Sequence, residues 1–261
     1  MYPHHQDTIA KVTERFQKQD EVLGLIIGGS IAHGFAREDS DVDIMIIISE
    51  EDYQNRSKTG DILYFDKEDC TYEAGYIDGK YLSVEFLKKV AASGSEPARF
   101  AFEGAILVFS KVNGLDQLLK SITTYPVESK KERIQRFYAQ FEAWRWYCDE
   151  ALKHDNKYLL NLSISNLILF GGRLILAHNE TLYPYHKWFL KVLQNVKHKP
   201  ENMMAYIANL LETQSRDDID AFYECITGFT PWEISEINWG AHFAMDCELT
   251  WMNDKVPIAD I

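Results

Sequence analysis

Two aspartates, Asp41 and Asp43, carry the clearest chemical signal in the sequence. They are two positions apart and lead directly into a continuous apolar run, Ile44 to Ile48, which is typical of a strand covered on both faces. Side chains two positions apart on a strand project from the same face, so the two carboxylates can share a divalent cation. Hard oxygen ligands of this kind favour magnesium over zinc.

A short turn, Gly28-Gly29-Ser30, precedes the aspartate pair, and ten residues separate Ser30 from Asp41. The Ser30 hydroxyl suits the N-cap of a helix, and the first turn of a helix offers unpaired backbone N–H groups to an anion. We therefore expect Gly29 and Ser30 to bind phosphate beside the metal, at one edge of a sheet. Arg37, in the polar loop between turn and strand, is a further candidate for a phosphate contact, although a solvated arginine is more common there.

The same segment, GGSIAHGFAREDSDVDIMI over residues 28–46, resembles the signature of the polymerase-β-like nucleotidyltransferase superfamily. That signature is a glycine-serine turn and a short helix before a strand with paired aspartates. The resemblance implies an α+β domain, a mixed β-sheet with flanking helices. It further implies a nucleoside triphosphate, expected to be ATP, as co-substrate and two Mg²⁺ ions as cofactors.

In that superfamily a later strand supplies a third carboxylate to the metal site. Glu85 is our candidate for it, because it alternates with apolar neighbours in the predicted strand Lys80–Leu87 and points away from them. Glu73 lies on the predicted preceding strand, Cys70–Ile77, and is a rival. Asp78 is another candidate for the third carboxylate. However, Asp78-Gly79 is the two-residue signal of a type I′ hairpin, so a position in a turn explains that aspartate better.

The resemblance implies that Asp41, Asp43 and Glu85 are the catalytic, metal-binding residues of nucleotidyl transfer. A nucleoside monophosphate would pass to an acceptor hydroxyl, while Gly29 and Ser30 hold the departing phosphates. The predicted activity is transfer of AMP from ATP to a small molecule. Nucleotidylation of a protein side chain, of toxin–antitoxin or regulatory type, and a non-catalytic nucleotide-binding module are the alternatives.

The net charge of −13 disfavours a nucleic-acid partner, because phosphate backbones require a basic face. A cationic small-molecule acceptor complements it better, so an aminoglycoside-like antibiotic is the first acceptor to test, which would imply a role in antibiotic resistance. Ser215 to Ile261 alone has a net charge of −8. The acidic side chains of this segment either lie on the solvent-exposed surface without a function or line a binding site for a positively charged substrate.

The four cysteines stand far apart without a CxxC pair, which indicates reduced thiols and a cytoplasmic location. The N-terminal residues lack the apolar core of a secretory signal. Leu159 to Ala177 comes closest to a membrane span, but polar residues interrupt it, so no membrane association is expected. Nothing in the sequence indicates the oligomeric state.

Two domains are expected, a catalytic domain over residues 1–120 and an α-helical substrate-binding bundle over residues 126–261, with Tyr125-Pro126 as the hinge. In the first part we predict a helix over 7–19 and strands over 22–27, 44–48, 62–65, 70–77, 80–87 and 105–109. In the second part we predict helices over 130–154, 157–178, 185–196, 201–212, 217–226 and 232–251, with Pro231 at the first turn of the last one.

The second part resembles small-molecule nucleotidyltransferases only in plan, since a helical bundle follows the catalytic domain. That resemblance implies a shared cleft in which Lys187 binds the triphosphate. Glu142, within a cluster of aromatic residues, is a candidate acid near the acceptor. Arg173 and His178 have the Arg-x4-His spacing of HEPN-type domains, some of which cleave RNA, but a core-edge arginine and a capping histidine explain the pair as well.

Overall fold

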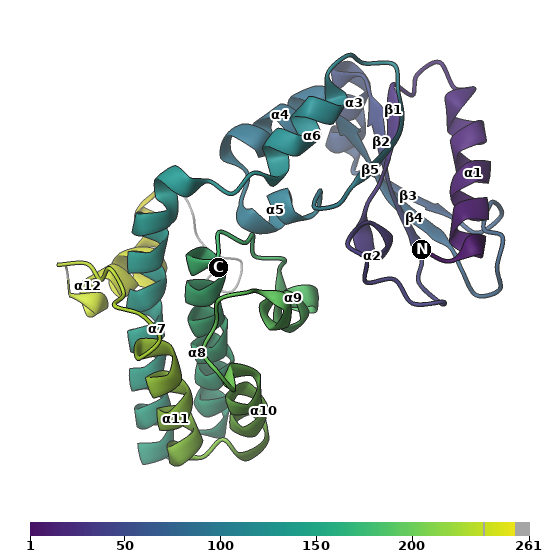
Figure 1. Cartoon of the computed structure of the whole chain (residues 1–261). Helices are drawn as coiled ribbons and strands as arrows, with labels where there is room; N and C mark the ends of the chain where they lie inside the picture. The colour runs from purple at the N-terminus through teal and green to yellow at the C-terminus, as the bar shows by residue number, and fades with distance from the viewer. Residues whose placement is uncertain (237, 254–261) are drawn as a thin grey trace. The chain divides into compact units, whose positions relative to one another are not determined.

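The computed structural model describes residues 1–236 and 238–253 (Figure 1). The chain divides into two compact units, Met1–Thr124 and Tyr125–Ile261. The end of the predicted second domain, residues 254–261, lies outside the described residues.

The first unit is built on one mixed sheet, which confirms the expected α+β class. Its strands are β1 (Gly24–Ile27), β2 (Val42–Ile48), β3 (Leu63–Asp66), β4 (Ile77–Ser83) and β5 (Ile106–Ser110). Their order across the sheet is β3-β4-β2-β1-β5, so β2 is the central strand. It pairs parallel with β4 and antiparallel with β1, while β3 and β5 form the two edges by antiparallel pairing.

Helices cover both faces of this sheet, which is why the apolar run of β2 is continuous. Ile46 and Ile47 are both fully buried, but they belong to hydrophobic cores on opposite faces. Figure 1 shows α1 on one face and α4 and α6 on the other. The helices of this unit are α1 (Pro3–Gln17), α2 (Gly29–Ala32), α3 (Glu50–Thr59), α4 (Val84–Ser93), α5 (Glu96–Phe100) and α6 (Leu115–Thr123).

The predicted hairpin at Asp78-Gly79 is wrong, because both residues lie inside β4. Gly79 permits close packing of strands and makes no turn: a Cβ atom there would lie 2.5 Å from Cγ1 of Ile44 and 2.7 Å from its carbonyl oxygen. The second arm of that hairpin ends early, since Ser83 caps α4 by accepting a hydrogen bond from the backbone N–H of Phe86 at 3.1 Å.

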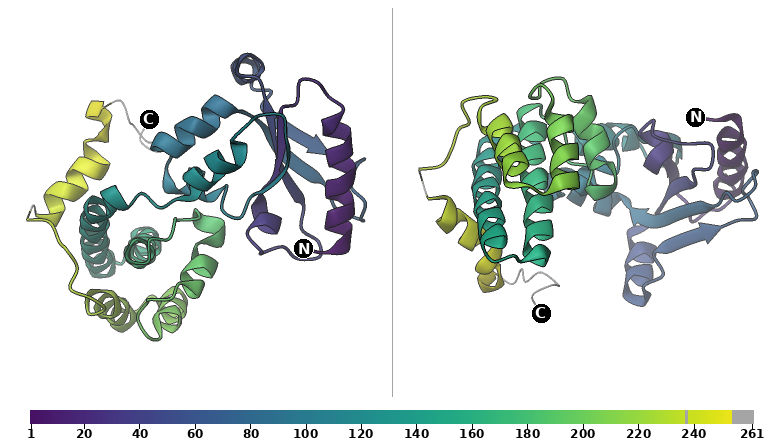
Figure 2. Two further views of the ribbon diagram at one scale, coloured as in Figure 1. Left: turned by 45° about the horizontal axis from the view of Figure 1, so that its top comes forward. Right: turned by 90° about the horizontal axis from the view of Figure 1, so that it is seen from below.

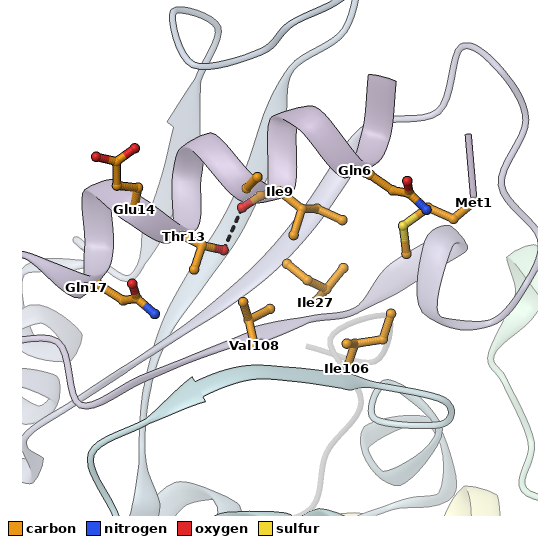
Figure 3. Close-up of a pocket in the computed structure, with 10 residues that line it drawn as sticks. Met1, Gln6, Ile9, Thr13, Glu14, Gln17, Ile27, Ile106 and Val108 are labelled. Carbon is orange, nitrogen blue, oxygen red and sulfur yellow. Dashed lines mark hydrogen bonds between the residues drawn. The ribbon is translucent and has the colours of Figure 1, made fainter. Parts of the chain in front are cut away.

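Beneath α1 the unit has an apolar hollow of about 390 Å³, next to β1 and the edge strand β5 (Figure 3). Ile9 of α1, Ile27 of β1 and Ile106 of β5 contribute to its lining.

All secondary-structure elements in the described part of the second unit are helices or helical turns. Its helices are α7 (Lys130–Lys153), α8 (Lys157–His178), α9 (Phe189–Asn195), α10 (Met203–Thr213), α11 (Arg216–Thr227) and α12 (Trp239–Phe243), with 3-10 turns η1 (Val127–Ser129), η2 (His186–Trp188) and η4 (Thr250–Asn253) and a π-helical turn η3 (Ala244–Glu248). α7 and α8 lie side by side (Figures 1 and 2), and α8 also contacts α9, α10 and α11. The predicted helix over 232–251 is wrong in its first half, since Pro231 starts no helix and α12 begins at Trp239.

Among the described residues, α8 alone is long and apolar enough to cross a membrane by length and composition. Of that apolar stretch 56% is buried within the unit, which is the pattern of a core helix. Gly171 supports this interpretation, because a Cβ atom there would lie 2.9 Å from the ring of Phe222 and 3.0 Å from the ring of Phe141.

Candidate functional site

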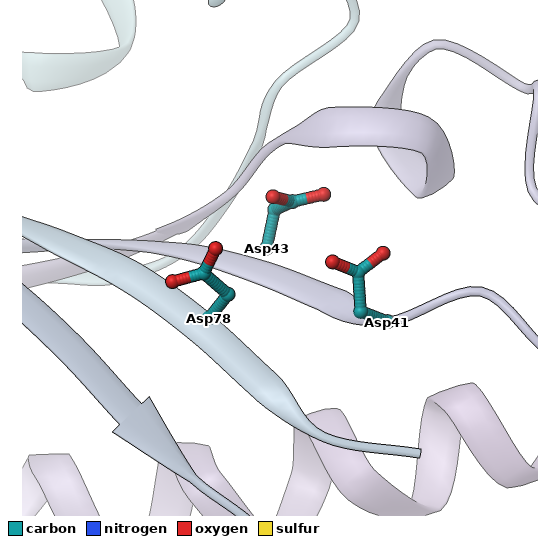
Figure 4. Close-up of side chains that lie close together, drawn as sticks. All are labelled: Asp41, Asp43 and Asp78. Atoms are coloured by element: carbon teal, nitrogen blue, oxygen red, sulfur yellow. The ribbon is translucent and has the colours of Figure 1, made fainter. Parts of the chain in front are cut away.

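Three aspartates of the first unit, Asp41, Asp43 and Asp78, form a compact group of carboxylates (Figure 4). Each offers one oxygen, and these oxygens all lie within 4.8 Å of one another. Asp41 and Asp43 are partly buried, whereas Asp78 is exposed. Three hard anionic ligands at this spacing suit a divalent cation such as Mg²⁺, because they would otherwise repel one another.

Strand pairing places Asp78 in this group. β2 and β4 are parallel, and Asp43 is aligned with Asp78 in their register. Aligned residues of neighbouring strands project from the same face of a sheet, so the two carboxylates meet. Asp41 lies just before β2, two residues from Asp43, and reaches the same side, as the spacing predicts (Figure 4).

Glu85, our candidate for the third carboxylate, lies elsewhere. It sits in the first turn of α4, half exposed, and its carboxylate pairs with Lys88 at 2.6 Å. Its place as an acid in the first turn, next to the N-terminal end of the helix dipole, explains it without a metal. Glu73 is exposed in the loop before β4.

The sequence offered one signal for Asp78, but it was ambiguous. An Asp-Gly pair marks a hairpin turn, yet glycine also occurs inside strands where another backbone approaches closely. Only the pairing of β4 with β2 decides between the two.

The glycine-serine turn packs directly against the carboxylates. Gly29 has a φ of +58°, and a Cβ atom there would lie 1.6 Å from Oδ2 of Asp43. The backbone N–H of Gly28 donates a hydrogen bond to the carbonyl oxygen of Asp43 at 3.0 Å. Glycine is therefore needed at position 29 for two reasons. The backbone has a positive φ, and the carboxylate of Asp43 fills the space that a Cβ atom would occupy.

Ser30 is buried at the start of α2, but it is not the N-cap that we predicted. Gly28 occupies the N-cap position. The Oγ atom of Ser30 meets no hydrogen-bond partner among the described residues. A buried hydroxyl without a partner loses about 1–3 kcal/mol, so this atom is suited to receive a ligand oxygen.

Arg37 lies in the loop between α2 and β2, with its side chain in solvent. Its Nε atom is 3.0 Å from Oδ1 of Asp39, and this hydrogen bond raises the pKa of Arg37 and lowers that of Asp39. The predicted phosphate contact of Arg37 stays a prediction.

Tyr76 is a residue of the site that the sequence analysis missed. The negative charge of Asp41, followed by burial and a hydrogen bond to Asp41, raises the pKa of its phenol, and the charges of Asp78 and Asp43 act in the same direction. Its ring lies 5.4 Å from the ring of Phe65 on β3. Nothing in the sequence distinguishes this tyrosine from the thirteen others of the fourteen in the chain.

Residues of α1 and of the loop before β4 support the loop that carries Asp41. The hydroxyl of Tyr72 donates to the carbonyl oxygen of Ser40. The fully buried ring of His5 lies 5.3 Å from the ring of Tyr72, and burial lowers the pKa of this histidine. His4 hydrogen-bonds to the carbonyl oxygen of Glu38 at 2.9 Å.

The predicted residues of the second unit have local partners. Lys187 is exposed in η2, with its ammonium 5.1 Å from the ring centre of Trp188, and its contact with a triphosphate stays a prediction. The guanidinium of Arg173 lies 4.2 Å from the ring centre of Phe137 and 4.3 Å from that of Tyr183. These contacts favour a packing role for Arg173 over RNA cleavage.

His178 also lies among aromatic rings, 5.3 Å from Phe229 and 6.1 Å from Trp232. Burial, followed by the charge of Lys130, lowers its pKa. A packing role therefore explains this histidine as well.

Part of the acidic segment has structural tasks. Asp218 accepts hydrogen bonds from the hydroxyls of Thr213 and Ser215 at the start of α11, and these bonds lower its pKa. Asp220 pairs with Arg145. Asp217 lies in the same first turn, where a carboxylate stabilises the helix dipole. The three acids are thus explained without a substrate.

Residues 9–98 match the family model of the nucleotidyltransferase domain. This range includes the Gly29-Ser30 turn, Asp41, Asp43 and Asp78. The first unit therefore contains a nucleotidyltransferase domain, and the predicted resemblance is confirmed at this level.

Two solved structures match the chain at low sequence identity. A nucleotidyltransferase-like protein from Exiguobacterium sibiricum 255-15 is 10% identical, with a TM-score of 0.48, over 98% of this chain and 83% of that one. Spectinomycin adenyltransferase AAD(9) from Enterococcus faecialis, solved with ATP and spectinomycin, is 15% identical, with a TM-score of 0.27, over 73% of this chain and 98% of that one. No curated protein matches the chain.

Proposed function

We propose that the protein is a magnesium-dependent nucleotidyltransferase that moves AMP from ATP to a hydroxyl of a small cationic molecule. The observation that carries this proposal is the group of three carboxylates, Asp41, Asp43 and Asp78, packed against the Gly29-Ser30 turn of a nucleotidyltransferase domain. Hard oxygen donors and a phosphate-binding turn at one place are what nucleotidyl transfer requires.

Each residue of the group has a task in this proposal. Asp41, Asp43 and Asp78 would hold the metal, which when bound offsets the negative charge of the phosphates during transfer. The orphan hydroxyl of Ser30 and the backbone of Gly29 bind the β- and γ-phosphates. Among the three carboxylates Asp78 is the exposed one, so it is the one we assign to face the acceptor and take the proton of its hydroxyl.

The transfer step itself is an in-line substitution at the α-phosphorus. The acceptor oxygen forms a bond to that phosphorus, and the bond from it to the bridging oxygen breaks. Pyrophosphate leaves, and the hydroxyl proton passes to the carboxylate.

The acceptor is proposed from charge. A protein of net charge −13 attracts cations and repels nucleic acid, so an amine-bearing hydroxyl compound of aminoglycoside type is the first class to test.

The test is transfer of label from α-³²P ATP to such acceptors, with pyrophosphate release as a second readout. Asp43→Asn should lower kcat at least about a thousandfold, because a misplaced metal loses several kcal/mol of transition-state stabilisation. The melting temperature should hold or rise, since a repulsive charge is removed. Asp39→Asn, in the same loop but paired with Arg37, is the matched control. An Asp43→Asn enzyme that kept its Mg²⁺-dependent activity would contradict the proposal, as would nucleotide binding with no turnover on any acceptor.

Lys187 supplies a second prediction. If its ammonium binds the triphosphate, Lys187→Ala should raise the KM for ATP about threefold to tenfold, with a smaller change in the KM for the acceptor, because the loss of one exposed charge contact amounts to about 1 kcal/mol. Lys191→Ala is the control, since that ammonium also lies near Trp188. An unchanged KM for ATP would mean that Lys187 is a surface lysine that does not bind the triphosphate.

A further inference from the structure

The helical unit has a cavity of its own, of about 370 Å³, between α7 and the segment that leads into α12. α7 contributes Gln135, Tyr138, Ala139 and Glu142, whose spacing places them on one face of the helix. Among the described residues, the opposite wall includes Ile234, Ser235, Glu236, Asn238, Trp239 and His242.

Glu142 is a carboxylate of this cavity that neighbouring tyrosines hold in place. Its Oε1 atom accepts a hydrogen bond from the hydroxyl of Tyr223 at 2.7 Å. Burial, followed by the charge of Glu142 and a hydrogen bond to it, raises the pKa of Tyr138 to about 12, and burial and Glu142 also raise the pKa of Tyr223. Both phenols therefore stay protonated at neutral pH and hold the carboxylate in a fixed position.

The lining is negatively charged. Glu142 and Glu236 are its carboxylates, and none of the ten lining residues among the described part of the chain is a lysine or arginine. Two nearby cations are already paired, Arg136 with Asp246 at 2.7 Å and Lys131 with Glu233 at 3.1 Å. A positively charged ligand would therefore balance the negative charge of the two carboxylates in the cavity.

The remaining lining groups specify the rest of the ligand. The half-exposed ring of Trp239 and the ring of Tyr138 offer aromatic faces to a cation or to the apolar side of a ring. Gln135 offers hydrogen bonds to hydroxyl groups, whereas the hydroxyl of Ser235 is already hydrogen-bonded to His242 at 2.9 Å. The volume lies at the lower end of ligand pockets, which are about 300–1,000 Å³, and suits a compound of one or two rings.

We propose that this cavity binds the acceptor as a hydroxylated organic cation, with its ammonium on Glu142 and Glu236 and its ring against Trp239. The inference rests on the proposed function, because it names the substrate class and the part of the chain that recognises it. It replaces the acidic first turn of α11 as the cation-binding feature, since those carboxylates have structural tasks.

The experiment measures binding without catalysis. The probe is 2-deoxystreptamine, a ring with two amines and several hydroxyls, titrated into the full chain by calorimetry in the absence of ATP and Mg²⁺. Its di-N-acetyl derivative, which is neutral, is the comparison ligand. We expect the amine to bind, the neutral derivative to bind at least tenfold more weakly, and added salt to weaken only the amine.

Two substitutions locate the binding. Glu142→Gln preserves the size of the side chain, and Glu236→Gln changes an exposed residue, so neither is expected to unfold the unit. Each should weaken binding of the amine, and the double variant should weaken it at least tenfold. Glu150→Gln, on α7 but outside the lining and next to Lys153, is the matched control and should leave it unchanged. Thermal melting of each variant checks the fold.

The outcomes separate the cavity from the reaction. Amine binding that persists in Asp43→Asn and is lost in the double variant supports the cavity, even if no transfer is found and the proposed function fails. Transfer to a cationic acceptor with the same KM in the wild type and the double variant overturns the cavity and leaves the proposed function standing. No binding of the amine at millimolar concentration also overturns the inference.

Discussion

β2 and β4 both carry a carboxylate of the candidate metal site, but they are recognised in different ways. Asp43 of β2 and Asp41 just before it belong to a local motif, with the turn, the loop and the strand all within residues 28–48. Asp78 of β4 stands in no motif, and its task follows from its alignment with Asp43 across a parallel pair. A local motif can be recognised in one segment, whereas a shared site needs the register between two segments.

The largest effect on kcat is expected from a test that compares the two candidates for the third carboxylate, Asp78 and Glu85. Asp78→Asn should lower kcat about a hundredfold to a thousandfold, because a charged metal ligand and the proposed base are lost together. Glu85→Gln should stay within about threefold of wild type, because its partner is Lys88 and only an exposed pair is lost. Steady-state kinetics at saturating Mg²⁺ measure both. The opposite ranking would restore Glu85 and make the alignment of Asp43 with Asp78 irrelevant to the chemistry.

A second test changes the contact between the two strands without touching a carboxylate. Gly79→Ala should destabilise the first unit by about 1–3 kcal/mol, since the new methyl group must displace Ile44 from the centre of the sheet. Thermal or urea unfolding reports the stability, and kcat should fall as the aspartates of the two strands move apart.

Gly114→Ala is the control for that variant. Its Cβ atom would meet open space, so only its φ of +77° opposes the substitution. It should lose less stability and retain kcat. Equal losses in both variants would mean that the tight strand contact has no special importance.

The smallest expected effect concerns Tyr76. Tyr76→Phe removes the hydrogen bond that orients Asp41 and leaves the ring against Phe65. The Mg²⁺ concentration for half-maximal activity should rise about twofold to fivefold, because one net hydrogen bond contributes about 1 kcal/mol or less. Tyr81→Phe, on the adjoining strand β4 and with its ring beneath Arg56, should have no effect. A change in kcat alone, at unchanged Mg²⁺ dependence, would contradict the orienting role.

Several features could be predicted because their causes are local. The apolar period and a capping residue, Asn156, determine α8, whose predicted limits of 157–178 agree with the structure. The paired aspartates and the glycine-serine turn are close in sequence, so this part of the candidate site could be recognised in one segment. The parallel partner of β2 could not be predicted, because hydrophobic pattern does not determine which strand lies beside which.

Other features were missed because two local signals competed. Val84 to Leu87 alternate like a strand, but the cap that Ser83 provides converts them into the first turn of α4. Residues 232–238 have the apolar content of a helix, yet α12 begins only after Asn238, whose side chain caps it. The partners of Tyr76 and Tyr72 depend on tertiary contacts alone.

The parallel pair of β2 and β4 also has a consequence for how the first unit folds. Asp43 and Asp78 are thirty-five positions apart in the chain (78 − 43), and β3 and α3 both lie between them. Loop closure over that distance opposes early contact, so the carboxylate group assembles only when the central strands have met. A cation that needs all three aspartates then binds the folded sheet and not the unfolded chain. Its binding stabilises the native state by mass action, which makes the metal dependence of unfolding a direct measure of whether this site has formed.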